Sequence, residues 1–445
     1  MADRGESVAI VGAGLAGCLL AALLGRRGIE VTLYERRADP RTAEPERGRS
    51  INLAISARGL AALDEVGLKD DALARALPMH GRMVHTPTGE QSSRPYSADG
   101  TRPIHSISRS ELNLALLEEA AKTPGVELRF GYRLRSADLD SGVLAFDTPA
   151  GAEEVRASIV LAADGAFSAA RRAVTFRTGF NFSQDYLEHG YKELTIPPTA
   201  DGEFAMSPDA LHIWPRGGSM MIALPNMDRS FTCTLFWTRA EFDALVSDEQ
   251  IVDHFAARYP DVVGLAPDLV DDYRHNPIGS LATIRSYPWV HRGERATLAL
   301  VGDAAHAIVP FFGQGANCAF EDCIEIDRSL AEHDGDWRRA LDAYQQRRKA
   351  NCDAIAEMAL DNFVEMRDRV NSPVFQAKTQ AEHWLERTLP GRFVSRYELV
   401  SFTTVPYAEI PARVGRQRLV TAVATAGVLA ANAARSLLPH REDHR

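Results

Sequence analysis

Short apolar runs alternate with amphipathic stretches along the first part of the chain. Val8–Val11 consists of four apolar residues and predicts a buried strand, and a glycine-rich turn follows it. An apolar helix is expected from about Leu15 to Arg26, with Gly28 after its end, and Val31–Tyr34 predicts the next strand. This order of strand, helix and strand predicts a βαβ unit with parallel strands.

The middle of the chain has the alternating pattern of strands. A helix over Glu111–Lys122, capped by Ser110, is expected to precede them. The predicted strand segments are Val126–Phe130, Leu144–Phe146, Val155–Leu161, several between Tyr191 and Trp237, and a buried one at Thr297–Val301. Turn residues separate the segments between Tyr191 and Trp237, which predicts a mostly antiparallel sheet. Beyond about Asp336 the pattern is helical, with loops expected near Pro373, Pro390 and Pro406.

Composition places the chain among globular proteins. Its 445 residues are enough for two or three domains, and 45% apolar and 25% charged residues are ordinary values. The net charge of -10 and the lack of a strongly basic domain argue against a nucleic-acid partner. The five cysteines are scattered and form no CxxC pair, so we expect neither a metal site nor a disulfide framework. A reducing cytoplasm fits best.

The two ends of the chain give no strong export or membrane signal. The segment before Val8 is polar and lacks the apolar core of a signal peptide. Leu419–Ala434 is rich in Ala, Val and Leu, but it is shorter than the ~20 residues of a spanning helix and contains Thr421, Thr425 and Asn432. We expect a helix packed on the protein or at a partner interface, with membrane-surface contact as the less favoured alternative.

The first motif is GAGLAG, which follows the first strand. Gly12 permits the tight turn, Gly14 lets the backbone approach a pyrophosphate, and Gly17 allows close helix–strand packing. The positive end of the helix dipole then faces the phosphates. Glu35, at the end of the second strand, can accept hydrogen bonds from ribose hydroxyls, which completes a dinucleotide site. Other residues expected beside this cofactor are Ala16, Arg36 and Arg37.

The second motif is DGAFSAAR, Asp164–Arg171. A strand delivers Asp164 to its carboxyl end, where open α/β sheets bind ligands. Gly165 permits an abrupt turn, and Arg171 lies in the helix that follows. An ordinary Asp-Gly turn with an arginine salt bridge is the alternative, and it explains the full pattern less well.

The third motif runs from Gly302 to Asp322. Asp303 can accept a hydrogen bond from a ribityl chain, and the backbone at Gly315, Ala316 and Asn317 begins a helix whose N–H groups can face a flavin pyrimidine. Such donors stabilise negative charge on a reduced flavin. His306 is expected to pack or to form hydrogen bonds rather than to act as a base. The three motifs in this order predict an FAD enzyme whose flavin meets a separate substrate.

Together these motifs resemble the aromatic hydroxylase group of FAD monooxygenases, which has the fold of para-hydroxybenzoate hydroxylase. Segments outside the flavin motifs are similar to signatures of the kynurenine 3-monooxygenase family. They include RGRSINLAISARG (Arg47–Gly59), HGYKELTIPP (His189–Pro198), LHIWPRG (Leu211–Gly217) and DNFVEMRDRVNS (Asp361–Ser372). These segments spread over most of the chain, so the resemblance extends to the family and not only to the fold.

The resemblance implies an α/β fold with a discontinuous Rossmann-like FAD-binding domain of the GR2 type. This domain would comprise residues 1–75, 100–180 and 280–345. An inserted, mostly antiparallel substrate domain would comprise residues 76–99 and 181–279, and residues 346–445 would form a helical C-terminal part. Eukaryotic members carry a C-terminal membrane anchor, whereas only a short Ala-rich segment precedes Arg445 here. Membrane contact is therefore not expected.

The resemblance also implies the reaction. NADPH would reduce FAD without a second Rossmann domain, which agrees with the single GxGxxG motif. The reduced flavin would react with O2 to a C4a-hydroperoxide, which hydroxylates L-kynurenine to 3-hydroxykynurenine in tryptophan degradation. No residue is assigned as catalytic base, since the amino group of the substrate ring donates electrons itself. The protein is expected to be a monomer or a homodimer.

Individual site residues follow from the resemblance by position. Arg82 and Tyr96 match residues that hold the kynurenine carboxylate, and Asn362 and Tyr397 match polar groups of the C-terminal helices. Further positions that match pocket residues are Pro310, Phe311, Glu365 and Met366, and further FAD contacts are Arg109, Ala54 and Leu134. Without the resemblance, Arg82 is equally a surface arginine, and Asn362 and Met366 are equally a helix packing face.

Alternative functions remain open at this point. One is a related hydroxylase that acts on another amino- or hydroxy-aromatic acid, with Arg82 holding a ring carboxylate. Another is a flavin reductase of the same fold that needs no O2. A third is a flavoprotein interaction module without NADPH oxidation.

Overall fold

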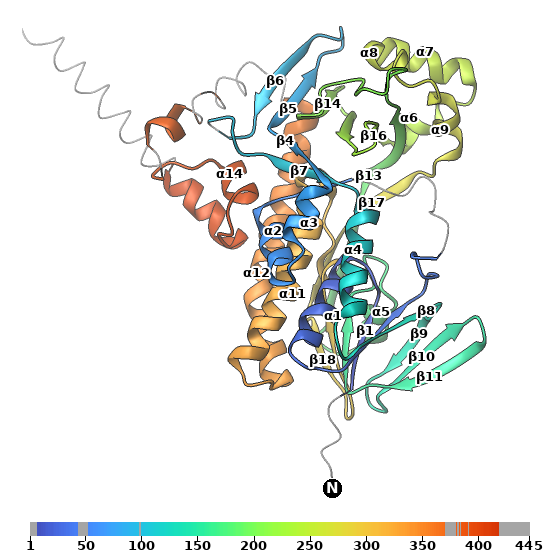
Figure 1. Ribbon diagram of the computed structural model, residues 1–445, viewed down its shortest axis with the longest axis vertical. Coiled ribbons are helices and arrows are strands. Elements are labelled where there is room, and N and C mark those ends of the chain that lie inside the picture. Colours follow the sequence, from blue (N-terminus) through green and yellow to red (C-terminus); the bar gives the residue numbers. More distant parts are fainter. Residues whose placement is uncertain are drawn as a thin grey trace, which may run out of the picture.

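The computed structural model describes residues 7–42, 52–97, 99–369, 380, 382, 384–389 and 391–417. One end of the molecule holds a six-stranded sheet and the other a seven-stranded sheet, with long helices running along the side of both (Figure 1). The boundaries of the three domains expected from the sequence stay a prediction.

The six-stranded sheet contains the strands that precede all three glycine motifs. Its order is β18-β19-β12-β1-β2-β8. The neighbours pair in parallel, except that β18 is antiparallel to β19. The bounds are β18 (Val290–Arg292), β19 (Thr297–Leu300), β12 (Ile159–Ala162), β1 (Val8–Val11), β2 (Val31–Glu35) and β8 (Val126–Phe130). Every residue of β1 and β12 is buried, as expected for central parallel strands covered on both faces.

The βαβ unit at the start of the chain is confirmed. Helix α1 spans Leu15–Arg26, as predicted, and connects the parallel strands β1 and β2. Its residues from Cys18 to Leu24 are all buried, because the helix lies between the sheet and its neighbours α4 and α11. This burial explains why the helix is apolar nearly all round.

Two local predictions were wrong. Helix α4 spans Arg109–Lys122, and its cap is Ser108, whose hydroxyl accepts a hydrogen bond from the Glu111 N–H, rather than Ser110. A cap must lie before the first helical residue, and the helix begins two residues earlier than expected. The predicted strand Val155–Leu161 is two strands, because β11 ends at Arg156 and β12 begins at Ile159. The chain leaves an antiparallel hairpin there and enters the parallel sheet.

Two three-stranded sheets flank this sheet. One is ordered β11-β10-β9 and the other β3-β7-β4. Their bounds are β9 (Arg133–Asp138), β10 (Val143–Thr148), β11 (Gly151–Arg156), β3 (Leu53–Ile55), β4 (Ala76–Met79) and β7 (Ile104–Ile107).

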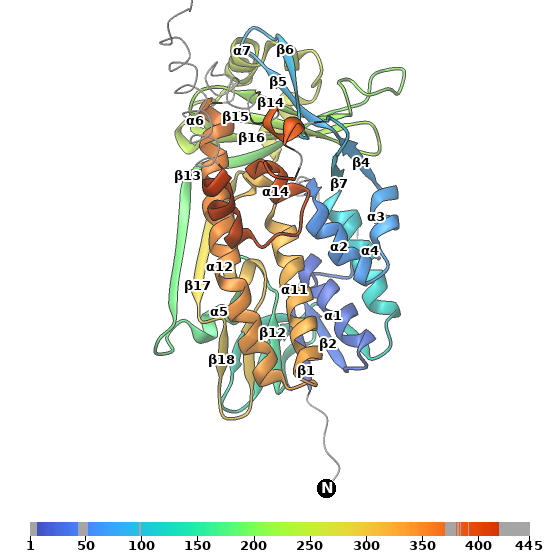
Figure 2. The ribbon, with the colours of Figure 1, turned by 90° about the vertical axis from the view of Figure 1, so that its left-hand side faces the viewer.

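The seven-stranded sheet is mostly antiparallel, as predicted. Its order is β17-β13-β16-β15-β14-β5-β6, and only β14 and β5 pair in parallel. The bounds are β17 (Gly279–Tyr287), β13 (Asn181–Ile196), β16 (Phe231–Thr238), β15 (Met220–Pro225), β14 (Ala210–Pro215), β5 (Gly81–His85) and β6 (Gln91–Pro95). The long strands β13 and β17 run side by side from this sheet toward the other end of the molecule (Figure 2).

Helices cover both sheets. Helices α11 and α12 pack lengthwise against each other, and α12 extends from the six-stranded end toward the seven-stranded end (Figure 2). The helical bounds not yet given are α2 (Ala57–Glu65), α3 (Lys69–Ala74), α5 (Ala169–Val174), α6 (Arg239–Asp243), α7 (Asp248–Arg258), α8 (Pro260–Val263), α9 (Leu269–His275), α10 (Asp303–His306), η1 (Pro310–Phe312), α11 (Gly315–Glu332), α12 (Trp337–Val364), η2 (Glu365–Arg369), α14 (Arg396–Ser401) and η3 (Tyr407–Glu409).

Among the described residues beyond Asp336, α12, α14 and residues 410–417 are helical, as predicted. No helix within the described ranges combines the length and the hydropathy needed to cross a bilayer. The Ala-rich segment Leu419–Ala434 and the loop expected near Pro373 lie outside the described residues, as does Pro390 itself.

A buried polar network supports strand β5. His85 lies on β5 with its Nδ1 2.6 Å from Asp261 Oδ2. His212 donates from Nε2 to the Ser207 carbonyl, which leaves its Nδ1, 2.8 Å away, to accept from His85 Nε2. Trp214 donates to the same Asp261 carboxylate. Because side chains alternate along a strand, this network holds the face of β5 opposite to Arg82.

The network predicts a pH-dependent loss of stability on acidification. Burial, the largest cause, lowers the pKa of His212 from 6.5 to about 4. Between pH 6.5 and 4, His212 therefore binds a proton in the unfolded chain but not in the folded chain. The stabilisation is fully present above pH 6.5 and is lost as the pH approaches 4. We expect His212 to account for about 3 kcal/mol of this loss at most.

Urea unfolding at a series of pH values measures this effect. His212→Asn should flatten the slope between pH 6.5 and 4, whereas the control His275→Asn, whose side chain is 74% exposed, should keep it. Equal slopes for the two variants would contradict the assignment.

Candidate functional site

The turn after β1 has the shape of a phosphate cradle. Gly12 has a φ of 103°, and a Cβ there would lie 2.6 Å from the Ala163 carbonyl oxygen. A Cβ on Gly17 would lie 1.9 Å from the Gly12 oxygen, so helix α1 packs on the turn as the motif predicts. A Cβ on Gly14, in contrast, would have no heavy atom within 4 Å. The space over Gly14 is thus open at the N-terminus of α1, where a pyrophosphate would be stabilised.

Glu35 is buried beside this turn. Its carboxylate accepts hydrogen bonds from the Ala13 N–H and from the N–H and Nε of Arg37, all at 2.9 Å. Burial acts to raise the pKa of Glu35, but the hydrogen bonds and charge of Arg37 outweigh it, so the pKa is lowered. Glu35 is therefore an ionised acceptor at the end of β2, as a ribose-binding acid must be.

The second motif lies next to the first, at the end of β12. One oxygen of Asp164 accepts from the N–H groups of Ala169 and Ala170, at 2.7 and 3.0 Å. The other oxygen, Oδ1, is buried and has no hydrogen-bond partner. Buried polar atoms are nearly always paired. An unpartnered carboxylate oxygen beside a phosphate cradle therefore indicates that a bound ligand donates a hydrogen bond to it.

Arg171 connects the second and third motifs. Its guanidinium donates to the carbonyls of Ala304 and Ala166, at 2.7 and 2.5 Å. The alternative of an arginine salt bridge is therefore not what the structure has. Arg171 holds two backbone loops together instead, and its own helix α5 is capped by Ser168.

The third motif begins at Gly302, whose φ is 59°. The Gly302 N–H donates to Asp322, and the same carboxylate oxygen lies 2.5 Å from His306 Nε2. Burial acts to lower the pKa of His306, but the Asp322 charge outweighs it and raises the pKa to about 10. His306 is thus a buried, hydrogen-bonded residue, as the sequence indicated, while Asp303 begins α10 beside the cradle.

The N-terminus of α11 is clasped by the Asn317 side chain. Asn317 donates to the carbonyls of Ala54 and Gly313, at 2.9 and 2.8 Å, and accepts from the Ser56 N–H. With its side chain satisfied, only the backbone of Gly315, Ala316 and Asn317 is available to a flavin. The clasp holds strand β3, with Ala54, against this turn.

The remaining predicted cofactor residues lie around the same end of the six-stranded sheet. Arg109 begins α4, one turn before Asn113, whose amide donates to the Ala13 carbonyl. Leu134 is buried in β9, shortly after Tyr132, whose N–H donates to the Glu35 carbonyl. Ala16 faces Gly302, and Arg36 is exposed beside a hollow of about 490 Å³.

Arg82, Tyr96 and Tyr397 meet although they come from β5, from the residue after β6 and from α14. The two tyrosine rings stack with centroids 5.0 Å apart, and the Arg82 guanidinium lies 4.9 Å from the Tyr397 ring and 5.7 Å from the Tyr96 ring. Arg82 Nε is buried and has no partner. Burial acts to lower the pKa of Arg82, but Tyr397, Tyr96 and Glu365 raise it overall, so the guanidinium stays charged.

A second group lies on α12 and η1. Asn362 is buried and donates to the Phe311 carbonyl at 2.7 Å and to Met366 Sδ at 3.2 Å. The Phe311 ring stacks on Phe363 with centroids 4.0 Å apart. Asn362 therefore holds the η1 turn against α12, and Pro310 is exposed at the start of that turn.

Glu365 connects the two groups. It is half-buried, pairs with Arg396 at 3.3 Å, and its charge acts on Arg82. Phe312 adds a ring contact to Tyr397, with centroids 5.7 Å apart. The residues expected to bind substrate are thus brought into one neighbourhood, between the seven-stranded sheet and the C-terminal helices.

Arg58 is an important residue that the sequence did not single out. It is buried, pairs with Glu321 at 2.6 Å and donates to backbone carbonyls of Val400 and Val405. Its guanidinium lies 3.8 Å from the centroid of the Tyr407 ring. Arg58 thereby ties the C-terminal segment to α11. Its place in the RGRSINLAISARG segment was the only available signal.

The chain is similar to known proteins. A family model described as an FAD binding domain matches residues 6–359. The open space over Gly14 and the unpartnered Asp164 oxygen agree with the requirements of that cofactor.

Solved structures share the fold. The tetrameric form of 2-methyl-3-hydroxypyridine-5-carboxylic acid oxygenase superposes with a TM-score of 0.67 at 21% identity, over 86% of this chain and 96% of that one. The p-nitrophenol 4-monooxygenase of Pseudomonas putida DLL-E4 has a TM-score of 0.65 at 20% identity, over 86% of this chain and 94% of that one. The predicted fold class is confirmed.

Relatives in sequence identify the family and not only the fold. A kynurenine 3-monooxygenase of Myxococcus xanthus is 47% identical over 91% of this chain and 87% of its own length. Those of Stenotrophomonas maltophilia and Dictyostelium discoideum are 45% and 44% identical, over 96% and 91% of this chain and 94% and 89% of their own lengths. The chain belongs to the kynurenine 3-monooxygenase family.

Proposed function

We propose that the chain is an FAD-dependent monooxygenase that uses NADPH and O2 to hydroxylate L-kynurenine to 3-hydroxykynurenine. Family membership supports the reaction and its cofactors. The observation that carries the choice of an amino-acid substrate is the buried, unpartnered Nε of Arg82 beside two stacked tyrosines. A buried guanidinium with a free N–H is a carboxylate receptor.

The substrate carboxylate would bind the Arg82 guanidinium. The guanidinium offers a fork of donors, and the nearby hydroxyls of Tyr96 and Tyr397 can add hydrogen bonds. Burial raises the pKa of Tyr96 and that of Tyr397, so both hydroxyls stay protonated donors at neutral pH. The aromatic walls exclude water, which strengthens the ion pair.

The η1 turn and the start of α11 would form the boundary between substrate and flavin. Asn362 holds the Phe311 carbonyl, and Asn317 holds the Gly313 carbonyl, so the turn is fixed from both sides. Bound FAD would supply electron transfer and oxygen activation. The backbone N–H groups of Gly315, Ala316 and Asn317 would stabilise negative charge at the flavin ring.

The proposed assignment includes no protein base. His306 is engaged by Asp322, and Glu365 is paired with Arg396. The amino group on the substrate ring, ortho to the carbon that is attacked, supplies the electron density instead.

Cellular location and assembly belong to the proposal as well. All five cysteines are free and buried, which fits a reducing cytoplasm. We propose a monomer or a homodimer, and size-exclusion chromatography with light scattering distinguishes these from the tetramer of a structural neighbour.

The first prediction concerns the reaction itself. Under anaerobic conditions, NADPH should reduce the flavin quickly only when L-kynurenine is present, and added O2 should give a product heavier by one oxygen atom. Stopped-flow absorbance and mass spectrometry measure the two steps. Slow flavin reduction with L-kynurenine but fast reduction with another amino- or hydroxy-aromatic acid would assign that acid as the substrate instead. Turnover without O2 uptake would contradict a monooxygenase.

The second prediction concerns Arg82. Arg82→Gln should raise the KM for L-kynurenine about 100-fold, because a charged hydrogen-bonded pair worth about 3 kcal/mol is lost. The control Arg285→Gln removes an arginine of the same sheet that pairs with Asp185, and it should leave KM within about twofold. An unchanged KM in Arg82→Gln would show that the substrate carboxylate does not bind at Arg82.

The third prediction concerns the phosphate cradle. Gly14→Ala places a methyl group in open space, so it should leave stability nearly unchanged but weaken FAD binding at least tenfold, since the backbone can no longer approach the pyrophosphate. Gly17→Ala should instead destabilise the fold by about 1–3 kcal/mol, because its methyl group would overlap the Gly12 oxygen. Flavin fluorescence titration and urea unfolding separate the two effects. FAD affinity that is unchanged in Gly14→Ala would contradict the cradle.

A further inference from the structure

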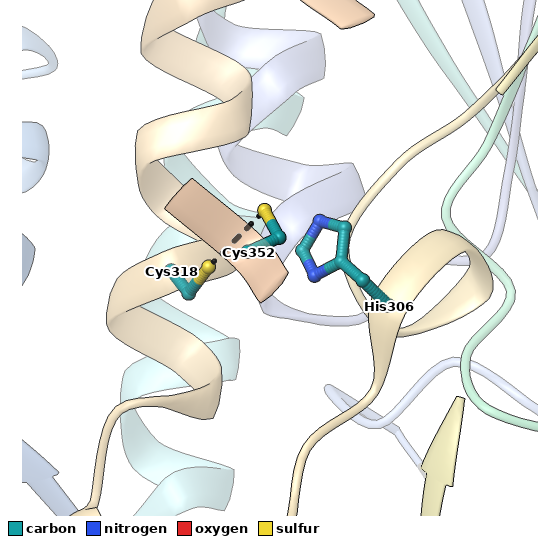
Figure 3. A group of neighbouring side chains, drawn as sticks. All are labelled: His306, Cys318 and Cys352. Atoms are coloured by element: carbon teal, nitrogen blue, oxygen red, sulfur yellow. Dashed lines mark hydrogen bonds between the residues drawn. The ribbon is translucent and has the colours of Figure 1, made fainter. Parts of the chain in front are cut away.

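Two cysteines far apart in the sequence meet between α11 and α12. Cys318 Sγ lies 3.6 Å from Cys352 Sγ, and both residues are 1% exposed (Figure 3). Cys318 directly follows Asn317, at the helix start assigned above to the flavin. The sequence predicted no cysteine pair, since no CxxC spacing links these residues.

Positive groups surround the pair. Arg348, one turn before Cys352 on α12, places Nη2 3.2 Å from Cys318 Sγ and 3.8 Å from Cys352 Sγ. His306 points toward the two sulfurs from α10 (Figure 3). The carboxylates of Asp322 and Glu321 bind Arg348 at 2.7 Å each, and Asp322 Oδ1 also lies 4.0 Å from Cys352 Sγ. A thiolate next to a guanidinium is a reactive sulfur.

The two thiols differ in acidity. The hydrogen bond from Cys352 is the largest cause that lowers the pKa of Cys318, to about 6, with the charges of Arg348 and His306 acting in the same direction against burial. Burial raises the pKa of Cys352, which stays a thiol. The other cysteines, Cys18, Cys233 and Cys323, are equally buried, and burial raises the pKa of each. Exposure therefore does not distinguish the five residues, but thiolate character does.

A metal ion fits this cluster less well. Ligand atoms of His306, Cys318 and Cys352 lie within 4.8 Å of one another. However, Arg348 donates to the Cys318 sulfur and Asp322 binds His306, so a divalent cation would face a guanidinium and compete with an existing ion pair. Structural zinc also requires a fourth ligand.

We propose that Cys318 and Cys352 form a dithiol site that hydrogen peroxide oxidises to an intramolecular disulfide. The Cys318 thiolate attacks one peroxide oxygen, an S–O bond forms, and the O–O bond breaks with release of hydroxide, which is protonated to water. The Cys352 sulfur then attacks the Cys318 sulfur, the S–S bond forms, and the S–O bond breaks with release of a second water that carries the Cys352 proton. Two thiols are oxidised and one peroxide is reduced to two waters.

The disulfide would couple the flavin-facing turn to the long helix. An S–S bond of about 2.05 Å requires the sulfurs to approach from their 3.6 Å separation, and the bond would link the first turn of α11 covalently to α12. The proposed disulfide goes beyond the proposed reaction and does not depend on it, because mass spectrometry of the peptides detects the disulfide whatever substrate the enzyme hydroxylates.

The test treats the full-length, FAD-loaded enzyme with hydrogen peroxide, blocks the remaining thiols with N-ethylmaleimide in denaturant, and maps peptides without reduction. We expect a cross-linked Cys318–Cys352 peptide, lighter by two hydrogens than the sum of its parts and lost after dithiothreitol. Cys18, Cys233 and Cys323 should stay at least tenfold more available to the maleimide than Cys318.

Two variants make the result decisive. Cys352→Ser should abolish the cross-link and leave Cys318 as a mixed disulfide or as a sulfinic or sulfonic acid. The control Cys233→Ser should form the cross-link as the unmodified chain does. Equal oxidation of all five cysteines would overturn the proposal, and so would oxidation of Cys318 without a cross-link in the unmodified chain. One equivalent of zinc in the purified enzyme, lost in Cys318→Ser, would establish the metal reading instead.

Discussion

The register of three parallel strands determines where this protein places its chemistry. Val11 pairs with Ala162, and Ala162 pairs with Leu300, so β1, β12 and β19 end at the same level of the sheet. Within two residues of its end, each strand is followed by a glycine or aspartate turn that belongs to one of the three motifs. Because parallel strands present their carboxyl ends at one edge, motifs nearly 300 residues apart in the chain meet there. The close contacts of Gly12 with Ala163, and of Gly17 with Gly12, leave no room for a side chain at Gly12 or Gly17.

A buried set of charges holds the third turn in place. Asp322 is fully buried and receives the Gly302 N–H, His306 and Arg348 together. Removing one partner of such a set leaves an uncompensated buried charge, which typically costs about 3–5 kcal/mol. The same arginine lies beside the Cys318 sulfur, so one buried guanidinium both stabilises the cofactor turn and activates a thiol. The link between stability and reactivity follows from the low dielectric of the interior.

The substrate neighbourhood is assembled differently, from side chains on separate elements. Arg82 is supported from below by the His85–Asp261–His212 network, and Tyr397 reaches it from a helix that Arg58 ties to α11. The described residues 391–417 are therefore part of the proposed substrate site. Arg82 Nε is a buried donor without a partner there, so the enclosure still lacks a ligand acceptor.

The sequence by itself determined the local elements and the three turns. The bounds of α1, the parallel βαβ unit and the acid at the end of β2 all follow from periodicity and glycine placement, which act over a few residues. It did not determine that Ser108 rather than Ser110 caps α4, or that the chain breaks between β11 and β12. At both places the local pattern allows a boundary at either of two nearby residues. Only the tertiary structure decided the Tyr96–Tyr397 stack, the role of Arg58, the Asn317 clasp and the meeting of Cys318 with Cys352. These contacts join residues that no periodic pattern relates, and they depend on how packed elements orient each side chain.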